Sequence, residues 1–266
     1  MPLWHLAILA LIQGITEFLP ISSSAHLVLA PVVLGTADQG LLVDIAVHVG
    51  TLVAVCVYFW RETLQLPVGT VKLLGKSRNA PEAKLALHVI LASIPIVIAG
   101  FTLHSIAPGG LRAIELIAWS TIIFGILLGV ADWIGAKRKS VGSMDRLDAI
   151  LIGLAQILAL IPGTSRSGIT MTMARFIGYS RQEAARFSLL LSIPAIGGAA
   201  VLGAIDVYQA GSWRLGLDLA VAAVLAGLSA FAAIAVMMRW LSKASFMPFV
   251  VYRLLLGAVL LAYIYL

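Results

Sequence analysis

The sequence has little charge and little cysteine, and both shortages restrict what the protein can be. Only 11% of its 266 residues are charged, whereas soluble domains carry about 25%, and 61% are hydrophobic. This composition excludes a soluble globular protein. The single cysteine, Cys56, excludes an intrachain disulfide and a site built from several cysteine ligands. No Lys or Arg precedes the first apolar run, so a cleaved signal peptide is not expected.

Long apolar runs recur from one end of the chain to the other, and they are continuous rather than alternating, which favours helices. A helix needs about 20 apolar residues to cross the hydrocarbon core of a bilayer. Six stretches meet that length: 41–60, 85–105, 113–134, 187–207, 217–238 and 247–266. The sequence therefore predicts an all-α integral membrane protein with six full transmembrane helices.

Two further apolar regions, 3–34 and 149–178, are broken by a proline and a polar cluster. A proline disfavours helix at the residue before it, and a Ser or Thr after it can cap a new helix. Each region is therefore expected to form two half-helices that meet at a polar tip. We call residues 17–26 the first tip and residues 162–168 the second tip. The alternative is one kinked span in each region, since membrane helices tolerate proline.

The distribution of basic residues favours re-entrant hairpins over kinked spans. If both broken regions return to the side they entered from, the loops 61–84, 135–148, 179–186 and 239–246 share one side and carry thirteen of the 18 Lys and Arg residues. The opposite side then carries only Arg112 and Arg214. Cytoplasmic loops are rich in basic residues, so this topology places both termini on the periplasmic side. Full crossings would split the thirteen into nine and four.

The same topology divides a single membrane domain into two repeats, about 1–134 and 149–266, joined by a cytoplasmic loop at 135–148. Each repeat holds one broken hairpin and three spans, and an odd number of spans inverts the second repeat. Residues 19–25 also line up with residues 161–167. Inverted repeats with broken helices bring their breaks together near the bilayer midplane, which makes the two tips the candidate functional site.

The tips carry most of the polar chemistry inside the membrane. Glu17 and Arg166 either pair with each other or serve a function, because a charge within the bilayer is costly. Half-helix N-termini present free N–H groups that favour phosphate, and a guanidinium can grip phosphate with two nitrogens. These features predict a site for a phosphate or diphosphate.

A nucleophile and a base are also present at the first tip. Ser23 and His26 are three residues apart and share a helix face, so they could act as an activated hydroxyl and its general base. The imidazole could instead attack phosphorus itself, and the residue types do not choose. Glu17 could ligate a divalent cation that bridges phosphate oxygens, or it could orient His26.

Other polar or small residues are expected to be structural. Asp44 and His48 are four apart on one span and are expected to bond each other. Arg253 lies near the start of the last span, where a long side chain can reach toward the interface. Gly125 and Gly129 could support a homodimer, although close packing within the chain is the more common use of such a pair.

Residues 13–26 read QGITEFLPISSSAH, and residues 162–168 read PGTSRSG. With the segment 245–253, these motifs resemble those of the undecaprenyl-diphosphate phosphatase family, also known for bacitracin resistance, and the resemblance covers essentially the whole chain. It implies an enzyme of the bacterial inner membrane that removes the terminal phosphate of undecaprenyl diphosphate and recycles the carrier for peptidoglycan synthesis. It also implies a divalent cation, Mg²⁺ or Ca²⁺, and a site reached from the periplasmic face. The partners would be the polyprenyl diphosphate and membrane lipids, with no nucleic acid.

The resemblance implies a catalytic core of Glu17, Ser23, His26 and Arg166, with Glu17 as the cation ligand. The substrate-binding residues around this core would be Ser22, Ser24, Thr164, Ser165 and Ser167. Members with a paired acidic motif carry Glu where this chain has Gln13, so acid–base and cation roles are expected to fall to Glu17 alone.

Two rival functions make different demands on the sequence. Enzymes that resemble phosphatidate phosphatases need a histidine after a Ser-Arg motif, and none follows Arg166, because all five histidines lie at or before His104. That class is excluded. A transporter or flippase of a polyprenyl phosphate or another anion stays as the alternative, since inverted repeats with broken helices are transporter architecture.

Overall fold

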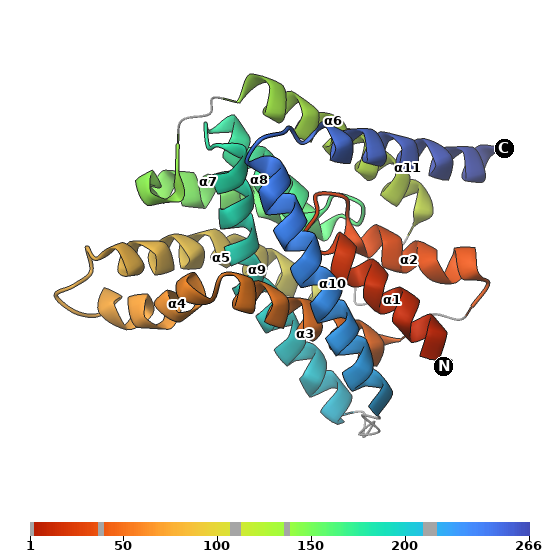
Figure 1. The fold of residues 1–266 in the computed structure, drawn as a ribbon, viewed down its shortest axis with the longest axis horizontal. Coiled ribbons are helices and arrows are strands. Elements are labelled where there is room, and N and C mark those ends of the chain that lie inside the picture. The colour runs from red at the N-terminus through yellow and green to blue at the C-terminus, as the bar shows by residue number, and fades with distance from the viewer. Residues whose placement is uncertain (1–2, 37–39, 107–112, 136–138, 210–216) are drawn as a thin grey trace.

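The computed structural model describes residues 3–36, 40–106, 113–135, 139–209 and 217–266 (Figure 1). Its helices are α1 (Leu3–Thr16), α2 (Ser23–Leu34), α3 (Leu41–Tyr58), α4 (Trp60–Leu73), α5 (Pro81–Ile106), α6 (Ile114–Ile134), α7 (Arg146–Gln156), α8 (Arg166–Phe176), α9 (Arg181–Gln209), α10 (Leu217–Leu241) and α11 (Met247–Tyr265), with short 3-10 helices η1 (Val141–Ser143) and η2 (Ile157–Leu160). Within these ranges the one strand-like feature is a single bridge between Lys139 and Tyr179. The all-α prediction is confirmed for the described residues.

The described residues contain five helices that are long and apolar enough to cross a membrane, namely α5, α6, α9, α10 and α11. The predicted span at 41–60 corresponds to α3, which passes the same test only together with α4, and the two are bent by 91° relative to each other. The number of candidate spans is therefore five, or six if this bent pair is one span. The α4 helix lies where the sequence predicts a loop. The loop is predicted because the segment is charged at both ends: Arg61 and Glu62 lie in the first turn of α4, and Lys72 lies in its last turn.

Both predicted breaks are present as turns between shorter helices. Residues 17–22 separate α1 from α2, and residues 161–165 separate η2 from α8. The α1 helix packs on α10, α2 and α3, whereas α8 packs on α6, α9 and α7. In Figure 1 the two turns lie beside each other at the centre of the molecule, and α11 packs against α6 next to them.

Small residues let α6 and α11 approach closely, and the outer surface is apolar. A Cβ on Gly125 would lie 3.0 Å from the Arg253 side chain, and one on Gly129 would lie 3.3 Å from Val250. Both glycines therefore serve packing within the chain. Large apolar side chains such as Phe101 (74% exposed) and Leu228 (65% exposed) face outward, as expected for a surface in contact with lipid.

Three of the four segments that the charge pattern assigns to one side of the membrane contact one another through polar groups. Arg186 of α9 lies 2.5 Å from Glu62 of α4. The amide of Val141 donates to a carboxylate oxygen of Glu183 at 2.7 Å. These contacts connect the segments 61–84, 135–148 and 179–186 at one end of the described molecule.

The fourth segment, 239–246, joins the same end of the molecule. Gln182 of the segment 179–186 donates to the carbonyl oxygen of Met238, the residue directly before 239–246, at 3.4 Å. Arg181 bonds the carboxylate of Asp132 at 2.6 Å. The amide of Phe246 donates to Asp132, at the end of α6, at 3.1 Å. Four residues that entered the charge count lie outside the described residues: Arg112, Lys137, Arg138 and Arg214.

Candidate functional site

The two tips contact each other directly, as expected from the broken helices. The hydroxyl of Ser167 donates to the carbonyl oxygen of Leu19 at 3.0 Å. Across the same junction, Nη2 of Arg166 lies 3.2 Å from Oε1 of Glu17. Groups that are 148 or 149 residues apart in the chain are therefore in hydrogen-bond contact.

Arg253 of α11 holds the backbones of the two tips together. Its side chain is 0% exposed and donates to the carbonyl oxygen of Pro20 at 3.3 Å, of Gly163 at 2.8 Å and of Thr164 at 2.9 Å. A fourth bond, to the carbonyl oxygen of Thr121 on α6, is 3.1 Å long. The expectation that Arg253 reaches toward the interface is wrong, because the non-helical carbonyls of the tips need donors that Arg253 supplies.

The tips begin their helices with the same backbone conformation. Ser22 and Ser165, with φ of 74° and 70°, are the described non-glycine residues with positive φ. Ser22 accepts a hydrogen bond from the amide of Ala25 at 3.4 Å, and Ser165 accepts one from the amide of Gly168 at 3.1 Å. Each serine is thus the N-cap of its helix.

These caps correct the register of the internal similarity. The sequence alignment pairs Ser22 with Thr164, whereas the matching caps pair Ser22 with Ser165, one residue further on. Thr164 and Ser165 are both hydroxyl residues that can cap a helix, so residue type alone does not choose between them. In the corrected register, Ser23 and Arg166 each occupy the first position of a helix.

Ser23 and Arg166 converge on the carboxylate of Glu17. The hydroxyl of Ser23 donates to Oε2 at 2.7 Å, and the guanidinium of Arg166 lies on Oε1. The amide of Gln13 also donates to Oε2, at 2.8 Å, and Glu17 is only 8% exposed. The ion pair that the sequence allows between Glu17 and Arg166 is present, and a buried charge pair of this kind is costly to break because either partner alone would be left unpaired.

Ser23 and His26 are not hydrogen-bonded to each other within the described chain. His26 Nδ1 lies 2.7 Å from the carbonyl oxygen of Ser22, which can only accept, so Nδ1 carries the proton. In the neutral ring Nε2 is then the acceptor, and the hydroxyl of Tyr252 donates to it at 2.5 Å. The bond to Ser22 therefore turns the imidazole toward α11, and Glu17 is the group that can take a proton from Ser23.

His48 is a member of this cluster that was expected to bond Asp44. Its Nδ1 lies 2.6 Å from the backbone carbonyl oxygen of Asp44, and its Nε2 lies 3.7 Å from Oε2 of Glu17. The i to i+4 spacing correctly places the two residues together, but the carbonyl rather than the carboxylate of Asp44 is the acceptor. The ring therefore points its free nitrogen at the site.

The remaining substrate-binding candidates lie around this core. The hydroxyls of Ser22 and Ser24 are 3.2 Å apart, and those of Ser165 and Ser167 are 3.1 Å apart. Ser24 is exposed, whereas Thr164 is fully buried. The capping serines accept from Ala25 and Gly168, whereas the first two N–H groups of α2 and α8 have no acceptor within their own helices and can donate to an anion at the junction of the tips.

A divalent cation could be held here only in part by the protein. The carbonyl oxygen of Gln13 is buried without a hydrogen-bond partner, on the side chain that contacts Glu17. Amide and carboxylate oxygens are suitable ligands for Mg²⁺ and Ca²⁺. Among the described residues no group of three or more His, Cys, Asp or Glu could hold a metal ion. The donors present fit a cation that takes its other ligands from phosphate oxygens.

Comparison with known proteins shows the family of the chain. Curated proteins from Roseobacter denitrificans and Ruegeria pomeroyi, both named undecaprenyl-diphosphatase, are each 48% identical to the chain, with 100% of both chains covered. A protein of the same name from Hahella chejuensis is 48% identical over 98% of both chains. The family model described as bacitracin resistance protein BacA matches residues 6–259. The chain therefore belongs to the BacA family of multi-pass membrane proteins.

Proposed function

We propose that the protein hydrolyses undecaprenyl diphosphate to undecaprenyl phosphate and inorganic phosphate, which recycles the lipid carrier of cell-wall synthesis and supports bacitracin resistance. The observation that carries this function is the convergence of Ser23 and Arg166, the first residues of two helices, on Glu17. The names of the relatives supply the substrate.

The diphosphate binds at the junction of the tips, where positive partial charge is concentrated. The starts of α2 and α8 offer N–H groups, and Arg166 offers a guanidinium that is partly exposed, at 15% of its side chain. These donors stabilise the charge that develops on the transferred phosphoryl group. The polyprenyl tail lies among the apolar helices, next to the exposed rim formed by Ser24 and Tyr252.

Ser23 attacks the terminal phosphorus, and its proton passes to Glu17 across the 2.7 Å hydrogen bond. The bond between that phosphorus and the bridging oxygen breaks, and undecaprenyl phosphate leaves. Water then hydrolyses the phosphoserine, which releases inorganic phosphate and restores the Ser23 hydroxyl. Attack by Nε2 of His26 is the alternative, and it requires the Tyr252 hydroxyl to move off that nitrogen.

A divalent cation, Mg²⁺ or Ca²⁺, accompanies the substrate in this proposal. Glu17 and the carbonyl oxygen of Gln13 would hold it together with phosphate oxygens, and it would neutralise phosphate charge. The sequence assigns cation binding to Glu17 alone, and this proposal adds the neutral side chain of Gln13 as a second ligand.

The proposed topology has six spans and two re-entrant hairpins in inverted repeats, about 1–134 and 149–266, with both termini on the periplasmic side of the inner membrane. Its support is the meeting of segments 61–84, 135–148, 179–186 and 239–246 at one end of the molecule. Full crossings by both broken regions would put the first two segments and the last two on opposite sides.

Phosphate release from undecaprenyl diphosphate by the purified protein tests the function. We expect turnover by the unmodified protein, loss of turnover in Arg166→Ala and Glu17→Ala, and loss on addition of a chelator, which a matched excess of Mg²⁺ or Ca²⁺ restores. The exposed variant Arg239→Ala on α10 is the control for a loss of positive charge and retains turnover. Unchanged turnover in both Arg166→Ala and Glu17→Ala would contradict the site.

A transporter or flippase of a polyprenyl phosphate is the second candidate, favoured by the contact between two broken helices. The assay in detergent separates the two, because detergent micelles have no second compartment to transport into. Phosphate release there requires hydrolysis, whereas a pure transporter releases none.

A further inference from the structure

A polar cavity lies at the basic end of the molecule, away from the tips. Its volume is about 290 Å³, and it is enclosed by α4, α5, α9 and the segment 141–144. The α7 helix, 11 residues long, leads from this end toward the second tip and spans about 16 Å. None of the tip residues lines the cavity, so it is a separate site.

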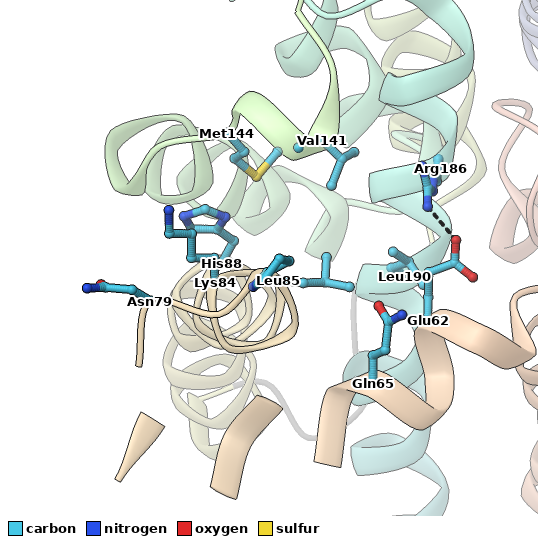
Figure 2. A pocket seen from close by; sticks show the side chains of 12 residues that line it. Glu62, Gln65, Asn79, Lys84, Leu85, His88, Val141, Met144, Arg186 and Leu190 are labelled. Atoms are coloured by element: carbon cyan, nitrogen blue, oxygen red, sulfur yellow. Dashed lines mark hydrogen bonds and ion pairs between the residues drawn. The ribbon is translucent and has the colours of Figure 1, made fainter. Parts of the chain in front are cut away.

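His88 of α5 lines this cavity and has no hydrogen-bond partner in the described part of the chain. The residue is only 6% exposed and faces the cavity. Figure 2 shows its ring beside Met144, with Leu85 and Leu190 between it and the opposite wall. The imidazole is therefore available to a ligand that enters the cavity.

The other groups of the cavity make it a place for an anion with an apolar part. Lys84, one helical turn before His88, is exposed at the mouth and forms no ion pair with a described residue. Arg186 lies on the opposite wall, where it contacts Glu62 (Figure 2). The floor between the two walls is formed by Leu85 and Leu190.

Charged groups of both signs act on His88, since Arg146 and Lys84 oppose the two nearby acids, and both acids also bond other groups. Asp145 and Asp148 interact with it electrostatically from the start of α7. Asp145 accepts from the amide of Asp148 at 2.8 Å, and Asp148 lies 3.0 Å from Nζ of Lys139. Lys84 and His88 thus face the cavity without an acid of their own to bind.

We propose that this cavity binds the phosphate headgroup of an anionic glycerophospholipid from the adjacent leaflet. Lys84 and His88 bind the phosphate. Arg186 releases Glu62 and binds the phosphate instead. The start of an acyl chain lies on Leu85 and Leu190. Ligand sites usually measure about 300–1,000 Å³, so this cavity has room for a headgroup and little more. Basic pockets between membrane helices suit such headgroups. Only the leaflet depends on the proposed topology.

Binding of dioctanoyl phosphatidylglycerol to the delipidated full-length protein, measured by native mass spectrometry, tests this site. We expect Lys84→Gln and His88→Gln each to weaken binding about tenfold, as the loss of a charge-assisted hydrogen bond does. Lys76→Gln is the matched control, because Lys76 is an exposed basic residue of the α4 to α5 turn that does not line the cavity. It should change the dissociation constant less than twofold, as should Glu17→Gln at the tips.

Three outcomes would overturn the proposal. One is a loss in Lys76→Gln as large as that in Lys84→Gln, since general attraction to the basic end would then explain binding. Another is equal affinity for dioctanoyl phosphatidylcholine, because the headgroup would then not be recognised. The third is equally tight binding of inorganic phosphate, which would assign the cavity to a soluble anion. The thermal midpoint of each variant verifies that it is folded, and because Lys84 is exposed, its substitution leaves the core intact.

Discussion

The first tip (17–26) and the second tip (162–168) start their helices on the same backbone and place different chemistry on it. Ser22 and Ser165 share a positive φ and the same capping bond, and each lies near the serine two residues on. The residue directly after the cap is Ser23 in the first tip and Arg166 in the second. Four residues after each cap stand His26 and Ile169. In the proposed mechanism the first tip supplies the hydroxyl nucleophile, and the second supplies the guanidinium of Arg166.

This difference indicates why two broken helices are needed for one site. A residue held at positive φ without being glycine costs about 1–3 kcal/mol and persists only where its surroundings enforce it. Here the contact between Ser167 and Leu19 and the four bonds of Arg253 are the surroundings that enforce it. Two copies of one strained turn, brought together in this way, aim a hydroxyl and a guanidinium at the same carboxylate.

Replacing the first residue of α2 or of α8 should have the largest effect on turnover. Ser23→Ala removes the proposed nucleophile, and we expect turnover to fall about 10³-fold or more. Arg166→Lys keeps the charge but cannot bind Glu17 and phosphate through a planar fork, so we expect a fall of about 10²-fold. Phosphate release under saturating undecaprenyl diphosphate measures both.

The matched control for Ser23→Ala is Ser242→Ala, which removes a hydroxyl from an exposed turn. It should leave turnover unchanged. A larger loss in His26→Ala than in Ser23→Ala would identify the imidazole as the attacking group and reject the serine pathway. Trapping a phosphoserine by rapid quenching would directly support attack by Ser23.

Arg253 tests whether the two tips must be held together. Arg253→Gln removes most of the donors on four carbonyl oxygens from α6 and both tips, and buried acceptors left without partners are costly. We expect the free energy of unfolding to fall by about 3 kcal/mol, and turnover to fall with it as the tips separate. Denaturation in detergent micelles measures the first effect.

Arg239→Gln is the control for this experiment, because Arg239 is an exposed arginine on α10 and its loss should shift stability by less than about 0.5 kcal/mol. Equal stability of Arg253→Gln and Arg239→Gln would mean that the tips are held by their own contacts and that Arg253 adds nothing.

The sequence is sufficient to predict the breaks at both tips and to single out Glu17 and Arg166, because proline and charge are unusual inside apolar runs, but it leaves open whether the two pair. It is not sufficient for the contacts made by Arg253 and Tyr252. Both lie on the last helix, 226 or more residues from their partners at the first tip. An arginine near a helix end has the same local pattern whether it reaches toward the interface or into the core.

The local sequence pattern also fails to predict the structure where two neighbouring residues are chemically equivalent or where a helix is polar. Thr164 and Ser165 can both act as caps, which is why the alignment of the tips is one residue out of register. The α4 helix has the composition of a loop, and it folds as a helix because it packs along α5. In each case the choice depends on tertiary contacts rather than on the segment itself.

The smallest expected effect concerns the asymmetry between His26 and Ile169. Tyr252→Phe removes the hydroxyl that donates to Nε2 of His26 at 2.5 Å while keeping the ring that stacks on the imidazole. The bond from Nδ1 to the carbonyl oxygen of Ser22 remains, so the tautomer is retained but the orientation of the ring is less restricted. Since a hydrogen bond of this kind contributes about 1 kcal/mol, we expect turnover to change by at most about fivefold, and a rise would support attack by the freed Nε2.

Tyr265→Phe on the same helix is the matched control, because its hydroxyl bonds Glu115 away from the tips. It should leave both turnover and its dependence on pH unchanged. Tyr252→Phe, in contrast, should shift the pH profile of turnover, since it alters the protonation equilibrium of a ring at the site. An unchanged profile in both variants would show that His26 takes no part in proton transfer, and would leave Ser23 and Glu17 as the only reacting pair of the first tip.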